Sequence, residues 1–276
     1  VFDLVTIDTN YVSKRDFVSK RTVDIPFTAT AIDQQISTDT THYRVANFLV
    51  DMMNDGSTSY FHNSIGGYFA AKMGKYNELY EFHLARNNIE VLNMLNTKYF
   101  IFPDGNQKPT VQINPDANGN AWFINNLSLA ETADEEIMAL DSLQTKLQAV
   151  VRAPYASSIN VLDYKKDSTA QIQLTDISST QLTYRYENES EGFAVFSEIY
   201  YPKGWNAYVD GELTEYYPVN YVLRGMKLPA GEHTVEFKFE PTVIKKGNTI
   251  TLISYLLLLL VPVSWFFVNK RKSNVS

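Results

Sequence analysis

Cysteine is missing from all 276 residues of the sequence. Neither a disulfide bond nor a thiolate metal site can therefore hold this chain together, and its stability must come from packing. The four histidines lack the paired spacing of metal ligands, and neither a Gly-x-Ser-x-Gly nor a Walker-type sequence occurs. The sequence thus predicts no metal, no cofactor and no catalytic residue of an independent active site.

The stretch around Asn118 matches part of a calcium-binding loop. Asn114, Asp116 and Asn118 would occupy its first, third and fifth positions. Pro115 fills the second position, however, and Asn125 replaces the bidentate Glu of the last position. We interpret this stretch as a polar turn.

Acidic residues are missing from the C-terminal end. Residues 245–276 contain five basic and no acidic side chains, whereas residues 1–244 carry 19 basic and 31 acidic ones, a net charge of −12. So acidic a surface is repelled by nucleic acid and by anionic headgroups, which argues against nucleic acid as a partner. We therefore expect residues 1–244 to be extracytoplasmic and residues 269–276 to form a basic cytoplasmic tail.

No charged residue occurs between Asn248 and Val268. A helix of this length covers roughly 30 Å, the thickness of the hydrocarbon core of a bilayer. Tyr255 and Trp265 lie where interfacial aromatic residues are expected. Residues 248–268 are therefore predicted to be a transmembrane helix in a lipid bilayer, the alternative being a core helix of a soluble protein.

The first methionine is Met52, and no signal peptide or earlier spanning segment is recognisable before it. An extracytoplasmic domain needs one or the other to reach its compartment. We therefore expect the chain to be the C-terminal piece of a longer membrane protein.

The patterning of apolar residues divides the rest of the chain into three parts. Residues 1–42 are rich in Thr, Asp and Ser and are expected to form an extended lead-in. Residues 43–152 mix helical and strand patterns, which predicts a mixed α/β extracytoplasmic region. Residues 153–241 alternate apolar and polar side chains, which predicts an antiparallel β-sandwich. The predicted fold class is α+β, with a mixed α/β region, an antiparallel β-sandwich and one C-terminal transmembrane helix.

Two helices and one strand are the clearest elements of the mixed region. Residues 76–94 have a helical composition that is interrupted at Asn87-Asn88, and residues 99–102 form an apolar run that predicts a buried strand. Thr132 and Glu135 have the spacing of a capping box. The helix after this box is predicted to bury one apolar face: Ile137, Leu140, Leu143, Leu147 and Val150.

Within the predicted sandwich, residues 234–240 alternate most regularly. Val235 and Phe237 are separated by charged residues, so one face of this strand is expected to be buried and the other wet. Asp210-Gly211 and Ala230-Gly231 supply turns at the spacing of a sandwich. Trp205 and Tyr208 could stack on sugar rings, but Trp205 is in phase with its apolar neighbours and is assigned to the core.

The segment from Gly66 to Tyr76 contains more glycine and aromatic residues than a core requires. Its functional interpretation is a substrate-binding site in which the glycine amides approach a phosphate and Lys72 and Lys75 add positive charge from one helix face. The alternative is structural, with Gly66-Gly67 forming a tight turn and the aromatic side chains belonging to the core. The predicted site residues are Gly66, Gly67, Tyr68, Lys72, Lys75 and Tyr76.

Several strings of the sequence carry a family resemblance: SIGGYFAAKMGKYNEL, VLNMLNTKYFIF, NPDANGNAWF, GWNAYVDG, VNYVLRG and LPAGEHTVEFKFEP. Together they resemble the C-terminal part of the YfhO-like bacterial membrane proteins, in the form found in Bacteroidetes. The resemblance extends from about residue 8 to the tail. The family commonly has His after Gly-Gly-Tyr, where this chain has Phe69, so no catalytic role is carried over to that position.

The resemblance implies a multi-pass protein of the bacterial inner or plasma membrane, similar in organisation to membrane glycosyltransferases. Such enzymes use polyprenyl-linked sugars and modify envelope glycopolymers, which are therefore the partners it implies. The catalytic acid would lie in an earlier extracytoplasmic loop, outside this chain. This chain would help to shape the donor or acceptor site without supplying the chemistry.

Two other classes of function stay open. A surface protein anchored by its C-terminal helix could use the sandwich as a carbohydrate-binding or adhesive module. A secreted glycoside hydrolase would need two carboxylates facing each other across a cleft, and 31 acidic residues allow such a pair.

Overall fold

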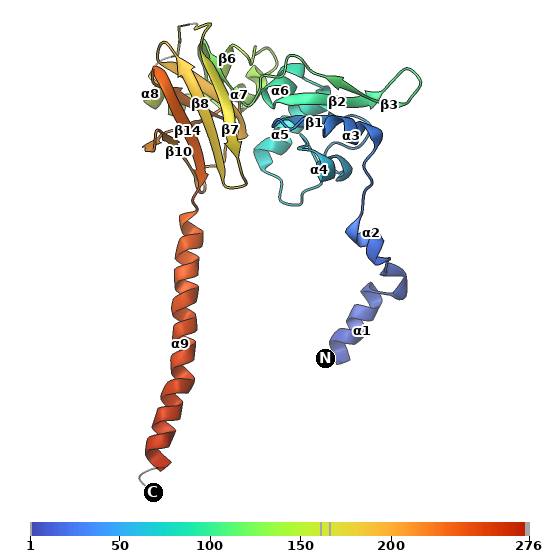
Figure 1. Ribbon diagram of the computed structural model, residues 1–276, viewed down its shortest axis with the longest axis vertical. Coiled ribbons are helices and arrows are strands. Elements are labelled where there is room, and N and C mark those ends of the chain that lie inside the picture. The colour runs from blue at the N-terminus through green and yellow to red at the C-terminus, as the bar shows by residue number, and fades with distance from the viewer. Residues whose placement is uncertain (1, 161, 166, 274–276) are drawn as a thin grey trace. The chain divides into compact units, whose positions relative to one another are not determined.

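A computed structural model describes residues 2–160, 162–165 and 167–273, and the chain forms two compact units, residues 1–119 (unit 1) and residues 120–276 (unit 2). The fold is α+β, with several antiparallel sheets, sandwich-like packing of strands and one apolar C-terminal helix, as the sequence predicts. Figure 1 shows the elements in chain order.

The N-terminal part of unit 1 is helical, so the prediction of an extended lead-in is wrong. Ser13, Ser19 and Thr30 each cap a helical turn by accepting a backbone N–H bond. Thr, Asp and Ser are as common at helix N-caps as in extended chain, and in this part of the chain they act as N-caps. The helices are α1 (Phe2–Tyr11), η1 (Lys14–Asp16), α2 (Lys20–Asp24) and α3 (Ala31–Ile36).

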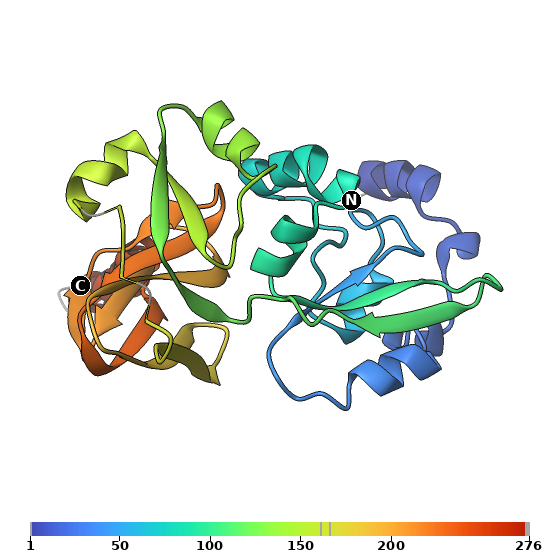
Figure 2. The ribbon, with the colours of Figure 1, turned by 90° about the horizontal axis from the view of Figure 1, so that it is seen from above.

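A small sheet forms the centre of unit 1. Strand β1 (Arg44–Asn47) runs parallel to β2 (Thr97–Pro103), which pairs antiparallel with β3 (Pro109–Ile113). The predicted strand at residues 99–102 is confirmed, and its turn projects from the rest of unit 1 in Figure 2. Buried side chains beneath the sheet form one cluster: Ile36, Tyr43, Val45 and Ile101.

The helical stretch that precedes β2 is broken where the sequence predicts. Asn87 adopts a left-handed conformation with φ 55°, and Asn88 caps the next helix through its side chain. Asn tolerates positive φ better than most residues, so this pair can end one helix and begin the next. The helices of this part are α4 (Ser57–Phe61), α5 (Gly74–Phe82), η2 (Leu84–Arg86) and α6 (Ile89–Met94).

Two antiparallel sheets face each other in unit 2 (Figure 1). One has the order β11-β10-β14-β8-β7 and the other β12-β13-β9-β4. Their bounds are β4 (Ala121–Ile124), β7 (Gln171–Ile177), β8 (Gln181–Asn188), β9 (Gly192–Ile199), β10 (Trp205–Val209), β11 (Glu212–Thr214), β12 (Tyr217–Val219), β13 (Leu223–Leu228) and β14 (Gly231–Phe239).

The core of unit 2 lies between these sheets. Tyr184, Phe196 and Phe237, from β8, β9 and β14, are fully buried in one cluster. The alternation predicted for β14 is confirmed, because Val235 and Phe237 are buried and their neighbours are not. Strand β4 pairs with β9 although it precedes residue 153, where the sequence places the start of the sandwich.

A parallel pair, β5 (Asn126–Ala130) and β6 (Gln148–Arg152), packs with α7 (Ala133–Ala139) and α8 (Ala153–Ile159). Thr132 caps α7 as predicted, with its hydroxyl 3.1 Å from the amide of Glu135. The predicted length of this helix is wrong, since α7 ends at Ala139 and Val150 lies in β6. The apolar residues after Ala139 continue the spacing of a helix, but residues 148–152 pair with β5 and form a strand instead.

Helix α9 (Thr242–Ser273) follows β14 directly and is the last element of unit 2. Its stretch Thr242–Pro262 is long and apolar enough to cross a membrane, and none of it is buried in the structure. Tyr255 and Trp265 are exposed. The side chains of the predicted basic tail, Lys270, Arg271 and Lys272, lie outside the described residues.

Candidate functional site

The two glycines of the predicted site are packed against another part of unit 1. A Cβ on Gly66 would lie 1.9 Å from the carbonyl oxygen of Met52, so only glycine fits there. Gly67 has φ +120° and donates its amide to the same oxygen at 2.7 Å, while the Gly66 amide donates to Ser64 Oγ at 3.1 Å. Both glycine amides thus donate to protein oxygens. In this structure they do not form the predicted phosphate site.

Tyr76 fixes the far end of the segment. Its hydroxyl donates to the carbonyl oxygen of Ile65 at 2.5 Å. Burial raises the pKa of Tyr76 to about 12, so the phenol stays protonated at neutral pH. Tyr76 therefore anchors the segment rather than exchanging protons.

The two predicted lysines do not share a helix face. Helix α5 begins at Gly74 because Met73, its N-cap residue, has an extended backbone. Lys72 precedes the helix and donates to the carbonyl oxygen of Met53, whereas Lys75 lies in the first turn. Both nevertheless belong to one short stretch of chain and bring two positive charges to it.

Between these anchors, residues 66–73 form what we call the aromatic loop. Tyr68 is 72% exposed and Phe69 is 65% exposed, and Met73 is exposed as well. The structural interpretation, in which these rings belong to the core, is therefore wrong for Tyr68 and Phe69. A loop held at both ends that presents two rings to solvent is the arrangement expected of a binding loop.

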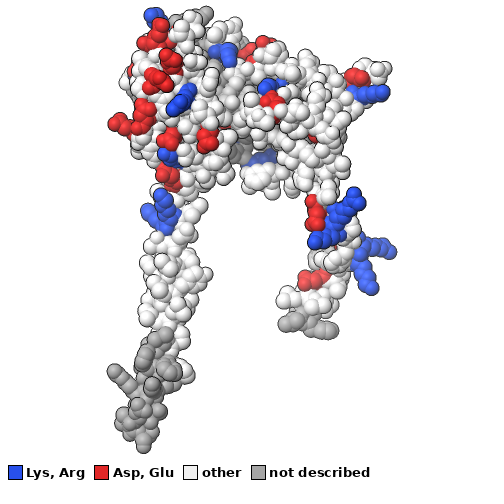
Figure 3. Space-filling view, viewed as in Figure 1, with Lys and Arg blue, Asp and Glu red and all other residues white. Residues whose placement is uncertain are grey.

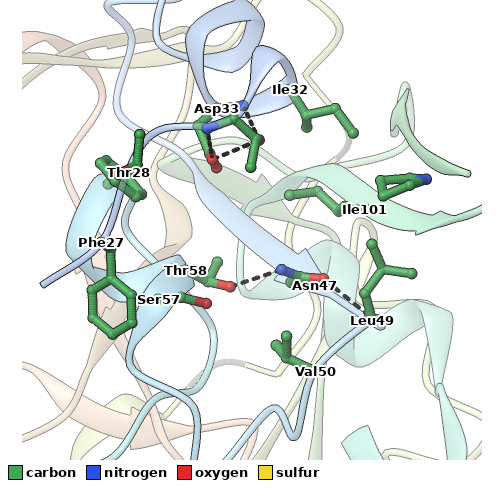
Figure 4. Close-up of a pocket in the computed structure, with 13 residues that line it drawn as sticks. Phe27, Thr28, Ile32, Asp33, Asn47, Leu49, Val50, Ser57, Thr58 and Ile101 are labelled. Carbon is green, nitrogen blue, oxygen red and sulfur yellow. Dashed lines mark hydrogen bonds between the residues drawn. The ribbon is translucent and has the colours of Figure 1, made fainter.

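A pocket of about 240 Å³ lies elsewhere in unit 1 (Figure 4). Phe27, Phe61 and Ile101 line it together with Asn47 and Thr58. The Asn47 side chain donates to Thr58 Oγ1 at 2.9 Å and accepts from the Leu49 amide at 3.0 Å, as Figure 4 shows. The pocket is smaller than the roughly 300–1,000 Å³ of typical ligand sites, and it contains none of the predicted site residues.

A hydrogen-bonded His–Asp pair borders this pocket. His62 Nε2 lies 3.0 Å from Asp33 Oδ1, and the His62 side chain is almost fully buried. Burial alone would raise the pKa of Asp33, but hydrogen bonds from Thr30 and His62 outweigh it and lower the pKa. This pair is not among the predicted site residues, although the Thr30-x-x-Asp33 capping box is a readable signal of the helix that positions Asp33.

In the part of the chain that the structure describes, no group of three His, Asp or Glu side chains is arranged to hold a metal ion. The polar turn interpreted from the calcium-like stretch is confirmed. Asn114 is buried, and its side chain donates to Asn93 Oδ1 at 2.8 Å and to the Thr97 carbonyl oxygen at 2.9 Å.

The glycine- and aromatic-rich strings of unit 2 have structural roles. Arg224 is buried, with its Cζ 4.6 Å from the ring centroid of Trp205 and 4.8 Å from that of Phe237. Asn220, with φ 49°, accepts from the Val150 amide at 2.9 Å and donates its own amide to the Val150 oxygen at 2.8 Å. These residues stabilise the packing of the strands in unit 2. We therefore keep the aromatic loop as the site candidate.

Comparison with known proteins gives one family. The family described as "Bacterial membrane protein YfhO" matches residues 106–251, more than half of the chain. The match covers the facing sheets of unit 2 and the first turns of α9, and it begins after the aromatic loop. No curated protein and no solved structure matches the chain.

Proposed function

Because this chain belongs to the family of bacterial membrane proteins described as YfhO, we propose that it is the extracytoplasmic domain and last membrane helix of a transferase of lipid-linked sugars. Its aromatic loop contacts the donor or acceptor, and the chemistry is supplied by another part of the parent protein. The acceptor belongs to the glycopolymers of the cell envelope.

The exposure of Tyr68 and Phe69 is the observation that supports this proposal best. Two adjacent exposed rings mark a surface that binds a partner, and sugar rings stack on aromatic side chains while prenyl chains pack against them. The close packing of Gly66 and the hydroxyl bond of Tyr76 hold the loop in place before any ligand arrives, which lowers the entropy cost of binding.

The lysines of the segment supply charge of the right sign. A polyprenyl-linked sugar carries phosphate, and Lys72 and Lys75 stand in a domain whose net charge is −12 over residues 1–244. Two lysines in the same short stretch of chain as the exposed rings suit a ligand that combines phosphate with a sugar or a prenyl chain.

The test is sugar transfer by the intact parent protein in its membrane. Replacing both Tyr68 and Phe69 by Ala should lower transfer by about tenfold or more, the loss expected when two stacking contacts of roughly 1 kcal/mol each disappear. Leu213→Ala is the matched control, because Leu213 is 71% exposed on unit 2. Normal transfer by the double variant at normal expression would refute a role of the loop in the substrate site.

The same variants separate this proposal from a membrane-anchored carbohydrate-binding module without catalysis. In that second case the parent protein would show no transfer activity, and the double variant would lose only adhesion to envelope glycans. The exposed rings of the aromatic loop would serve either function, so the transfer assay decides between them.

The extracytoplasmic placement has its own test, because the chain has no cysteine. Asn106→Cys introduces a single thiol at the exposed turn after β2. A membrane-impermeant maleimide should label this variant in cells whose inner membrane is intact. Labelling only after the membrane is broken would place unit 1 in the cytoplasm.

A further inference from the structure

A short internal repeat lies near the start of unit 1. The string Val-Ser-Lys-Arg occurs at residues 12–15 and again at residues 18–21, followed in each case by an apolar residue within two positions. We call residues 12–27 the basic-apolar segment. It contains Lys14, Arg15, Lys20 and Arg21 and two acidic residues, Asp16 and Asp24.

Each copy of the repeat forms one turn that is stabilised locally. Ser13 Oγ accepts from the Arg15 amide at 3.3 Å, and Asp16 Oδ2 accepts from the Ser13 amide at 2.6 Å. In the second copy, Ser19 Oγ accepts from the Thr22 amide at 3.3 Å. The turns η1 and α2 thus hold their shape by their own caps, without packing against a core.

Apart from Phe27, whose ring contacts Tyr60, the apolar side chains of this segment are not buried by unit 1. Every described side chain from Leu4 to Thr28 is exposed. The values include 74% for Phe17, 60% for Val18, 65% for Val23 and 55% for Ile25. A run of exposed large apolar residues on a capped scaffold marks a surface that is covered by a partner.

The charge of the segment indicates which partner. All four basic side chains are exposed, and Figure 3 shows Lys and Arg projecting from this part of unit 1. The core of a protein interface is depleted of charge, whereas an anionic lipid surface accepts Lys and Arg beside apolar side chains. The domain as a whole is acidic, but salt limits its repulsion to a Debye length of about 8–10 Å, so the local charge decides.

We propose that the basic-apolar segment lies in the interface of an anionic bilayer. Its four basic side chains contact lipid phosphates, and Phe17, Val18, Val23 and Ile25 enter the boundary of the acyl chains. The chain belongs to a membrane protein family and carries α9, so a bilayer is part of the surroundings of this protein. The proposal does not depend on sugar transfer.

A spin label tests it in the full chain. Val18→Cys places the only thiol of this 276-residue chain in the segment, and Asn106→Cys gives a matched label at an exposed turn. Each labelled chain is reconstituted in bilayers of phosphatidylcholine alone and in equal parts of phosphatidylcholine and phosphatidylglycerol. Accessibility to oxygen and to a water-soluble nickel chelate is then measured by power saturation.

The label at position 18 should become protected from nickel and accessible to oxygen in the anionic bilayer, and 1 M salt should reverse this. Reversing the charge of Lys14, Arg15, Lys20 and Arg21 to Glu should lower the ratio of bilayer-bound to free segment by on the order of 100-fold or more. The label at position 106 should stay nickel-accessible throughout. Equal nickel accessibility at both positions in the anionic bilayer would overturn the proposal. Protection that is the same in neutral lipid and in 1 M salt would also overturn it, because binding would then not depend on the charge of the lipid.

Discussion

The guanidinium carbon of Arg224 lies 4.6 Å from the ring centroid of Trp205, inside the core of unit 2. Arg224 Nε also donates to the carbonyl oxygen of Ile199 at 3.1 Å. A planar guanidinium can stack on a ring and reach a carbonyl at its edge at the same time, which an ammonium cannot. Two of the strings by which the chain resembles its family, GWNAYVDG and VNYVLRG, therefore meet in the core and stabilise the fold.

Arg224→Lys should lower the free energy of unfolding by about 2 kcal/mol, through loss of the stacked cation and of the bond to Ile199. The reverse exchange on the same strand, Lys227→Arg, is the control. Lys227 forms a largely exposed ion pair with Glu191, so its replacement should change stability by less than about 0.5 kcal/mol. Urea unfolding in detergent measures both, and equal changes would mean that the stacked arginine is not stabilising.

Phe237→Ala should cost about 3–5 kcal/mol, because its side chain is fully buried among the rings of Tyr184 and Phe196. Lys238→Ala, on the wet face of the same strand, should cost less than about 1 kcal/mol despite its ion pair with Glu236. Thermal unfolding of the two variants compares them. Similar losses would contradict the register of β14.

Strand β14 could be predicted because its burial follows from a local period of two residues. Strand β6 could not, since its pairing with β5 is parallel and joins residues about twenty positions apart. Val150 continues the apolar spacing of a helix that begins after Thr132, yet it lies in β6. The N-terminal helices are a different case, because the capping partners of Ser13 and Ser19 lie within three residues and local spacing was enough to predict them.

Gly66→Ala should destabilise the protein by more than about 2 kcal/mol, because the added Cβ would overlap the Met52 carbonyl group and the backbone would have to shift. Gly74→Ala, at the start of α5, meets nothing within 4 Å and should be neutral or stabilising by about 0.5–1 kcal/mol. Thermal unfolding compares the two. Equal stability would show that Gly66 is not held by this contact.

The fold changes the reason for which residues 66–76 are proposed as a site. Two adjacent glycines suggest amides that approach a phosphate, but only the folded chain shows that the Met52 oxygen fills that place. Phe69 was set aside because it departs from a family pattern, and it proves to be one of the most exposed rings of unit 1. Exposure depends on the tertiary fold, so no local spacing could reveal it.

Charge reversal of Lys72 and Lys75 to Glu should lower sugar transfer by the parent protein by on the order of tenfold or more, since two attractions to substrate phosphate become repulsions. Loss of the bond from Lys72 to Met53 should cost stability by only about 1 kcal/mol. Reversal of Lys108 and Lys203, two exposed lysines elsewhere, changes the net charge equally and is the control. Equal activity of the two double variants would show that the charges of Lys72 and Lys75 do not contribute to substrate binding.

Photo-crosslinking from position 68 in the intact parent protein tests most directly whether the aromatic loop contacts a lipid-linked sugar. Benzoylphenylalanine is incorporated in place of Tyr68, and in a second variant in place of Leu213, which is equally exposed. After illumination of cells supplied with radiolabelled sugar, the account predicts a labelled adduct at position 68 and none at position 213. An active parent protein that gives no adduct at position 68, or equal adducts at both positions, would contradict it.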